Sequence, residues 1–116
     1  MQFQIIKKIP IVRSLESPIT SGSTAMDVIA SLRYETGASA VVLYKDCLDE
    51  SFFRLSSKMA GEVLQKFVNY KMRLAIVGDF SHYTSKPLRD FIYESNKGSQ
   101  VGFWPAEEEA LAWLDR

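Results

Sequence analysis

The sequence predicts a small α/β domain built on a five-stranded mixed sheet, with elements in the order ββαβαβαβα. Short apolar, β-branched runs alternate with longer segments in which apolar residues recur at helical spacing. Strands that alternate with helices require parallel pairing with right-handed crossovers, whereas the first two runs, with no helix between them, predict an antiparallel hairpin. The length of 116 residues suits one domain covering residues 1–116.

The N-terminal part predicts a hairpin followed by a helix. Apolar and polar residues alternate over residues 3–7, and a second short apolar run covers residues 11–13. After a loop rich in Ser, Pro and Gly, Thr24 with Asp27 three residues later is typical of a helix start. Gly37 suits the left-handed cap at the end of that helix.

The middle of the chain predicts a buried strand and a long amphipathic helix. The continuous apolar run Ala40–Tyr44 is typical of a strand buried on both faces. Asp49, which lies between apolar residues at the spacing of a hydrophobic staple, predicts a helix N-cap. Apolar residues then repeat at helical spacing over residues 59–68. This helix either runs unbroken from Glu50 or begins anew at Ser56 or Ser57, since either serine could cap it.

The C-terminal part predicts two further strand–helix pairs. The most hydrophobic strand, over residues 74–78, is expected in the interior of the sheet. Ser85 suits the start of a helix that ends near Gly98. A last strand over residues 101–104 precedes a short helix opened by Pro105.

Composition and charge exclude several classes of protein. Fourteen basic residues balance fourteen acidic ones, which argues against nucleic-acid binding through phosphate attraction and against a polybasic membrane anchor. Apolar runs of about five residues are far below the roughly 20 that a membrane span needs, and no signal peptide is evident, so we expect a cytoplasmic protein. A near-neutral surface also favours self-association, which makes a homodimer one hypothesis.

The counts of cysteine and histidine limit the chemistry. A single cysteine, Cys47, excludes an internal disulfide and a cysteine-built metal cage, and we expect it to be a small buried apolar residue. A single histidine, His82, excludes a multi-histidine metal site. We therefore predict no metal and no cofactor. The aromatic residues Phe52 and Trp113 are expected in the core; if either were exposed beside Met59, it would indicate an interaction patch.

Two loops that leave the carboxyl ends of predicted parallel strands are the candidate ligand site. In open α/β sheets, ligands bind beyond these ends, where the strand order reverses. The first loop contributes Asp46, and the second contains an acid, hydroxyl groups, the histidine, a tyrosine and a lysine within eight positions. The candidate binding residues of the second loop are Asp79, Ser81, His82, Tyr83, Ser85 and Lys86.

The second loop has two interpretations. In the first, a phosphate or carboxylate lies on the helix N-terminus near Ser85 and Lys86, with Asp79 and His82 as proton or metal partners. In the second, which we favour, the serines cap helices, Asp79 satisfies backbone donors, and His82 and Tyr83 are solvated.

Three acidic residues offer a magnesium site if they converge. Asp46, Asp49 and Asp79 all follow predicted strands, and carboxylate oxygens are ligands for Mg²⁺. We favour the alternative that Asp49 is a helix cap and that the three carboxylates do not form a site.

Several stretches resemble known families. The element order is that of the STAS fold, which sulfate-transporter cytoplasmic domains share with the antagonists of bacterial anti-sigma factors, and the closing segment 107–114 resembles the end of the related sporulation-antagonist-like proteins. More specifically, the chain from about Ile19 onward resembles a bacterial family described as domain of unknown function 4180. The stretches that carry this resemblance are residues 33–37, 59–70, 74–81 and 90–98. The resemblance implies a STAS-like fold and a bacterial, cytoplasmic setting, and it implies no particular activity.

The STAS resemblance also implies a phosphorylation site. The antagonists carry an Asp-Ser pair at the start of their second helix, where the serine is phosphorylated. Ser56 and Ser57 stand nearest to that position and are candidate phosphorylation sites, although Leu55 stands where the aspartate is expected. We favour the alternative that both serines cap or line a helix start.

Taken together, these features predict a non-enzymatic regulatory module that binds a protein partner or a ligand. No complete catalytic set is present in the sequence, so we expect no enzymatic activity. The alternative is a small protein or enzyme that binds an anion, such as a phosphate, through the loop Asp79–Lys86.

Overall fold

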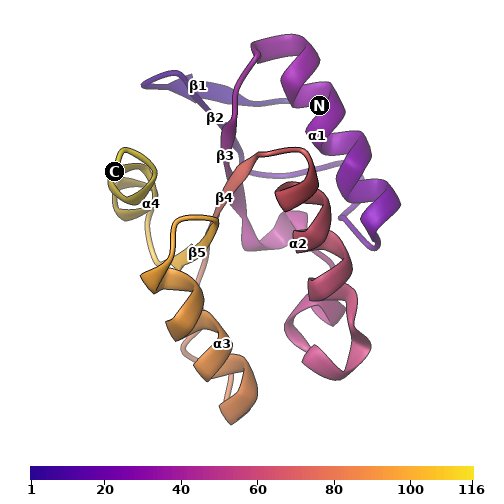
Figure 1. Ribbon diagram of the computed structural model, residues 1–116, viewed down its shortest axis with the longest axis vertical. Coiled ribbons are helices and arrows are strands. Elements are labelled where there is room, and N and C mark those ends of the chain that lie inside the picture. The colour runs from indigo at the N-terminus through magenta and orange to yellow at the C-terminus, as the bar shows by residue number, and fades with distance from the viewer.

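The computed structural model describes residues 1–116 as a single five-stranded sheet in the order β1-β2-β3-β4-β5, flanked by helices (Figure 1). The first two strands pair antiparallel and all others pair parallel, so the predicted mixed sheet with its N-terminal hairpin is confirmed. The strands are β1 Gln4–Ile6, β2 Ile9–Val12, β3 Ala40–Tyr44, β4 Arg73–Val77 and β5 Val101–Trp104.

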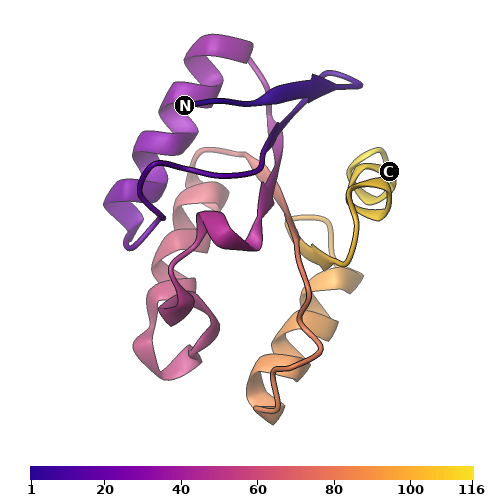
Figure 2. The same ribbon diagram turned by 180° about the vertical axis from the view of Figure 1, so that it is seen from behind.

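Three of the four α-helices cover one face of the sheet and the fourth covers the other (Figures 1 and 2). This follows from the sequential strand order, because right-handed crossovers that all advance in one direction place every connecting helix on the same face. None of the helices is both long and apolar enough to cross a membrane. The α-helices are α1 Gly22–Thr36, α2 Met59–Asn69, α3 Lys86–Lys97 and α4 Glu107–Leu114, and three 3₁₀ turns lie between β3 and α2: η1 Lys45–Cys47, η2 Glu50–Phe53 and η3 Leu55–Ser57.

The sequential order also corrects one expectation about the site. The strand order never reverses, so the sheet has no crevice of the kind that opens between helices leaving in opposite directions. The loops after β3 and β4 do lie side by side at the carboxyl edge, since these strands pair in parallel along their whole length. A ligand site at this edge must therefore be built from the ends of β3 and β4 and from the loops that follow them.

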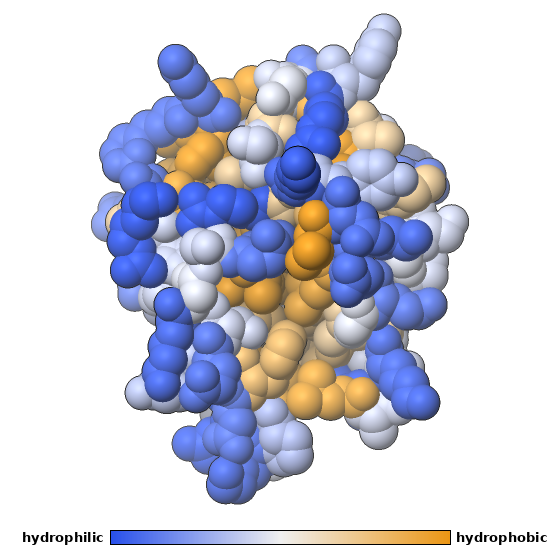
Figure 3. Space-filling model, in the orientation of Figure 1, coloured by the Kyte–Doolittle hydropathy of each residue, from blue (hydrophilic) through white to orange (hydrophobic).

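Successive residues of a strand point to opposite faces of the sheet and belong to two separate hydrophobic cores. In β3, Val41 and Leu43 join a core of 20 buried residues under α1, α2 and α3, whereas Val42 joins a core of 7 buried residues under α4. Phe52 and Trp113 are both buried, so the interaction patch that their exposure would have indicated is not formed. Apolar atoms still reach the surface in the middle of the face shown in Figure 3, between the helices of the larger core.

The hairpin turn consists of two lysines in an unusual conformation. Lys7 and Lys8 both have positive φ, 53° and 69°. Two left-handed residues in succession match the twist of an antiparallel pair, and such turns usually carry Asn-Gly. The tight connection that the sequence predicted is present, but its turn lacks the Asn and Gly residues that such turns usually contain.

The start of α1 differs from the prediction by one turn. Ser21, not Thr24, is the N-cap, and Thr24 is the third helical residue of a capping box: the Ser21 side chain accepts from the Thr24 backbone N–H at 3.2 Å, and Thr24 Oγ1 accepts from the Ser21 N–H at 3.0 Å. Gly37 ends the helix at φ 70°, as predicted.

The segment before α2 is less regular than the sequence predicted. Asp49 is an N-cap, as expected, but it caps the 3₁₀ turn η2. The α-helix does not run unbroken from Glu50; it begins at Met59, after Lys58 with φ 64°. The Ser57 hydroxyl accepts from the Met59 N–H at 3.2 Å, which is close to the restart that the sequence left open.

The C-terminal elements follow the prediction closely. Ser85 caps α3, with Pro87 in its first turn. The strand β4 lies between β3 and β5, in the interior of the sheet. Helix α4 begins at Glu107, two residues after Pro105.

Candidate functional site

A shallow pocket lies at the carboxyl edge of the sheet, between the ends of β3 and β4. Its volume is about 320 Å³, and both loops that the sequence selected contribute to it. Asp46, Asp79 and His82 were predicted site residues, whereas the others were not. The lining residues are Tyr44, Lys45, Asp46, Val77, Gly78, Asp79 and His82.

Lys45 is the most constrained charged group of the pocket. Its ammonium lies 3.2 Å from Glu50 Oε2 and above two rings, 5.1 Å from the centre of Phe53 and 5.3 Å from that of Tyr83. Burial by itself lowers the pKa of Lys45, but the polar interactions with Tyr83 and Glu50 outweigh it and raise the pKa above its ordinary value. Lys45 therefore stays charged, and its charge is already compensated within the protein.

Gly78 makes room for Lys45 at the end of β4. A methyl group on Gly78 would lie 2.7 Å from Lys45 Cβ, closer than such atoms approach one another in proteins. The Gly78 N–H donates to the Trp104 carbonyl at 3.1 Å, so the backbone is held by β5. The absence of a side chain at Gly78 is thus what allows the two loops to approach.

Asp79 is tied to its own loop. One carboxylate oxygen accepts from the Ser81 N–H at 2.9 Å and from the Ser81 hydroxyl at 2.6 Å. These bonds to Ser81, with smaller contributions from the charges of His82 and Lys45, lower the pKa of Asp79. The favoured interpretation of Asp79 as an acceptor for local backbone donors agrees with this geometry.

His82 is exposed and is not joined to an acid or a nucleophile. Its ring lies 4.1 Å from the ring of Tyr83, centre to centre, and its nitrogens take part in no side-chain hydrogen bond within the protein. A general base needs a nucleophile within hydrogen-bond reach. No hydroxyl group or thiol makes a hydrogen bond to His82.

Tyr83 does not line the pocket and instead contacts the 3₁₀ turn η2. Its ring stacks on Phe53 at 5.2 Å between centres, and its hydroxyl donates to Glu50 Oε1 at 2.8 Å. This bond, with the nearby charge of Lys45, lowers the pKa of Glu50. Sequence reasoning missed Glu50 because nothing in its spacing relates it to a loop 33 residues away; Lys45 could have been found, since it directly follows the carboxyl end of β3.

Ser85 and Lys86 lie outside the pocket. The Ser85 hydroxyl accepts from the Leu88 N–H at 3.4 Å, and the Lys86 ammonium pairs with Asp90 at 2.7 Å. In both ribbon views, α3 begins at its end remote from the sheet (Figures 1 and 2). The loop after β4 therefore carries the helix N-terminus away from Asp46 and Asp79, and the predicted candidates divide into two groups.

The three acidic residues of the magnesium hypothesis do not form one cluster. Asp46 and Asp79 line the pocket, but Asp49 does not. Asp49 accepts from the Ser51 N–H at 3.1 Å and from its hydroxyl at 2.5 Å, which lowers the pKa of Asp49. Nowhere in residues 1–116 do three or more His, Cys, Asp or Glu side chains gather as metal ligands would.

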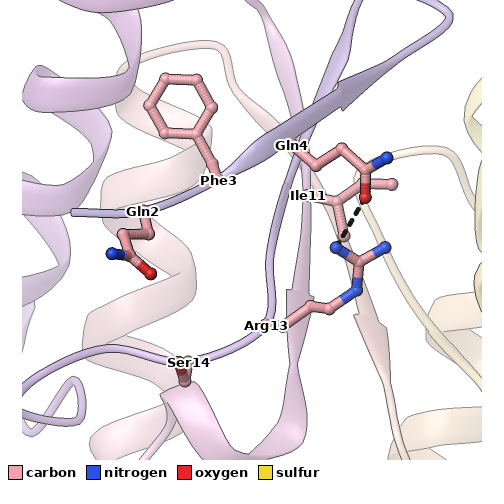
Figure 4. A pocket seen from close by; sticks show the side chains of 6 residues that line it. All are labelled: Gln2, Phe3, Gln4, Ile11, Arg13 and Ser14. Atoms are coloured by element: carbon pink, nitrogen blue, oxygen red, sulfur yellow. Dashed lines mark hydrogen bonds between the residues drawn. The ribbon is translucent and has the colours of Figure 1, made fainter.

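A second pocket, of about 280 Å³, opens where β1 and β2 separate (Figure 4). Gln4 and Arg13 reach toward one another across it, with Arg13 donating to Gln4 Oε1 at 2.8 Å. The same guanidinium makes two bonds to the Glu107 carboxylate, at 2.9 and 2.8 Å, and Tyr44 also donates to Glu107. The guanidinium of Arg13 thereby links α4 to the sheet through Glu107.

The candidate modification and thiol sites differ in access. Ser57 is partly buried, and its hydroxyl donates to the Ser51 carbonyl at 2.6 Å, whereas Ser56 is exposed. Cys47 is fully buried, as predicted. Burial raises the pKa of its thiol to about 11, so Cys47 is not a nucleophile at neutral pH.

The fold and the pocket define a small α/β domain with a polar, largely self-paired carboxyl edge. Its sequence matches the protein family described as domain of unknown function (DUF4180) over residues 6–114. The chain belongs to this family. Neither the curated proteins nor the solved structures include a match to the chain.

Proposed function

We propose that the protein is a non-enzymatic regulatory module of STAS-like type that binds a protein partner at the carboxyl edge of its sheet. We extend the proposal to a bacterial, cytoplasmic setting, which rests on the family resemblance. The single cysteine, buried and without a disulfide, agrees with a reducing compartment.

One observation carries the proposal: most of the ionisable groups of the carboxyl edge are engaged within the protein, and the two that are not, Asp46 and His82, form no hydrogen bond to a nucleophile. Arg13 and Tyr44 donate hydrogen bonds to the carboxylate of Glu107. Lys45 and Tyr83 donate hydrogen bonds to the carboxylate of Glu50. Catalysis by acids and bases needs groups left free to exchange protons with a substrate. Groups that are paired in this way instead give a surface a fixed shape and charge, which suits recognition.

The exposed part of this edge is acidic. Asp46 and Asp79 are both exposed and line the same shallow pocket, next to the exposed His82. Asp46 makes no side-chain hydrogen bond within the protein. We therefore expect the partner to present a basic surface here, since complementary charge favours both encounter and correct orientation.

The proposal is tested by affinity capture from a bacterial lysate with the charge-reversed variant Asp46→Lys. We expect a discrete partner to be retained by the wild type and lost with Asp46→Lys, while Glu35→Lys, an exposed residue near the end of α1, retains it. Equal capture by both variants would contradict the proposed surface. Turnover in hydrolase or transferase assays that Asp79→Ala abolishes would contradict a non-enzymatic role.

A second candidate function is the binding of a small anion in the same pocket. The observation in its favour is that Lys45, whose pKa is raised by its contacts with Tyr83 and Glu50, lines the pocket together with His82. A ligand of the native state raises its stability by about 2.7 kcal/mol at a concentration 100 times its dissociation constant. Thermal-shift screening with nucleotides and sugar phosphates checks this, and stabilisation that persists in His82→Ala would argue against this site.

A further inference from the structure

A basic pocket lies at the opposite end of the sheet, at the amino ends of β4 and β5. With a volume of about 400 Å³, it is larger than the pocket at the carboxyl edge. It contains three cationic side chains, one serine and one glycine, and no carboxylate or apolar side chain. Its lining residues are Arg73, Lys97, Gly98, Ser99 and Arg116.

Arg73 is the fixed element of this pocket. Its guanidinium donates to three backbone carbonyls, those of Ser99 at 2.5 Å, Leu114 at 2.9 Å and Trp113 at 3.4 Å, and lies 5.1 Å from the centre of a Trp113 ring. A guanidinium has five N–H donors, so two are left for a further acceptor. Because the protein already holds the side chain in place, a ligand would not have to order it.

Two of these carbonyls belong to the last turn of α4, which carries the negative end of the helix dipole. A negative helix end by itself disfavours an anion. Here Arg73 lies directly against the carbonyls of Trp113 and Leu114 and compensates them. Helix α3 also ends at this pocket, at Lys97, and the side chains of Lys97 and Arg116 supply two further positive charges there.

The other two cationic side chains of the pocket, those of Lys97 and Arg116, could turn toward a bound ligand without breaking strong interactions. Lys97 makes one ion pair, with Glu94 at 3.5 Å, and its ammonium lies 4.4 Å from the centre of the Tyr93 ring. Both contacts are on the exposed surface of the same helix, where such interactions contribute little in water. The side chain of Arg116 makes no ion pair or hydrogen bond within the protein. The Ser99 hydroxyl also has no partner, and neither Glu94 nor Asp115 lines the pocket.

We propose that this pocket binds the phosphate group of a small ligand. A dianionic oxyanion matches three cations and a hydroxyl donor. The site is separate from the carboxyl edge and does not depend on the function proposed for that edge. Inorganic phosphate and a phosphate monoester share the chemistry that the pocket recognises.

The experiment is a titration of the ¹⁵N-labelled protein with inorganic phosphate and, separately, with glycerol 3-phosphate, followed by amide chemical shifts. We expect saturable shifts at Gly98 and Ser99 at millimolar concentrations or below. Tighter binding of glycerol 3-phosphate would identify an ester as the ligand, whereas equal affinity would identify the phosphate group alone.

Two variants test the assignment. Lys97→Gln combined with Arg116→Gln removes two exposed cations and should weaken binding at least about tenfold, because each provides a charge-assisted hydrogen bond. Lys86→Gln is the matched control, since Lys86 is an exposed, ion-paired lysine at the other end of α3. The absence of saturable shifts at Gly98 and Ser99, unchanged binding in the double variant, or an equal loss in the control would each overturn the proposal.

Discussion

The side-chain amide of Asn96 makes both hydrogen bonds that a neighbouring strand would make to Phe103. Its nitrogen donates to the Phe103 carbonyl at 3.0 Å, and its oxygen accepts from the Phe103 N–H at 2.7 Å. Phe103 lies in β5, the edge strand, and its backbone groups face away from β4. Helix α3 thereby closes an edge of the sheet that would otherwise offer free backbone groups to another chain.

Replacing Asn96 with alanine should destabilise the protein and open this edge. We expect a loss of about 1 to 2 kcal/mol in the free energy of unfolding, because the N–H and C=O of Phe103 lose their partners. Urea denaturation measures the loss, and analytical ultracentrifugation should detect increased self-association. Asn69→Ala, which removes an exposed side-chain bond to Gln65, should change stability by less than about 0.5 kcal/mol. Equal stability of the two variants would show that the edge bonds contribute nothing.

The contacts of Glu107 predict part of the dependence of stability on pH. Bonds from Arg13 and Tyr44 lower the pKa of Glu107 below its reference value of 4.5. A lowered folded-state pKa stabilises the protein above pH 4.5, and this contribution is lost as the pH falls through the folded-state value. Glu107→Gln should therefore differ most from the wild type near neutral pH and least near pH 3.

Urea denaturation at several pH values between 7 and 3 checks this expectation. The control is Glu108→Gln, an exposed neighbour whose carboxylate makes no hydrogen bond within the protein. The control should follow the wild type throughout. A constant difference between Glu107→Gln and the wild type at all pH values would contradict the assigned role of the Glu107 charge.

Two glycines should respond in opposite directions to substitution by alanine. A methyl group at Gly78 would lie 2.7 Å from Lys45 Cβ, so one of the two loops must shift, and we expect a loss of about 1 to 3 kcal/mol. A methyl group at Gly61, within α2, meets no atom within 4 Å, so Gly61→Ala should stabilise the helix by about 0.5 to 1 kcal/mol. Thermal unfolding of both variants measures the two effects. A neutral Gly78→Ala would mean that the loops can separate without cost.

Cys47 should be unreactive until the protein unfolds. The side chain is fully buried, its pKa is raised to about 11, and its thiol donates to the Val12 carbonyl at 3.4 Å. Labelling with a chromogenic disulfide reagent at pH 8 should be slow in native buffer and rapid in denaturant. Rapid labelling of the native protein would reveal local opening of the segment around η1.

The strands and helices were predicted well where the local sequence pattern was compatible with only one type of secondary structure. The run Ala40–Tyr44 is a strand with the predicted bounds, because five apolar residues bounded by polar ones have few alternatives. The segment after Asp49 was predicted less well. Its helical periodicity is interrupted by two 3₁₀ turns and by Lys58 with positive φ, conformations that depend on how Phe52 and Phe53 pack into the core.

The candidate site, too, was predicted where local sequence position suffices and was missed where it depends on the packing of distant segments. Asp46, Asp79 and His82, which the sequence assigned to two loops at the same edge of the sheet, line one pocket. Loop position could not separate them from Ser85 and Lys86, since proximity in sequence does not reveal which way a loop turns. Nor could it reveal that Glu50 connects Lys45 with Tyr83, because pairs far apart in the chain leave no periodic signal.

The sequence by itself determined the element order, the parallel pairing and the limits that one histidine and one cysteine place on the chemistry. These properties follow from short-range hydrophobic patterning, turn residues and composition, which each segment carries regardless of its neighbours. Only the tertiary structure decided which polar groups meet: Glu107 with Arg13, Asn96 with Phe103, and Arg73 with the end of α4. The reason is physical, since hydrogen bonds act over about 3 Å and the partners come together only when the strands and helices pack.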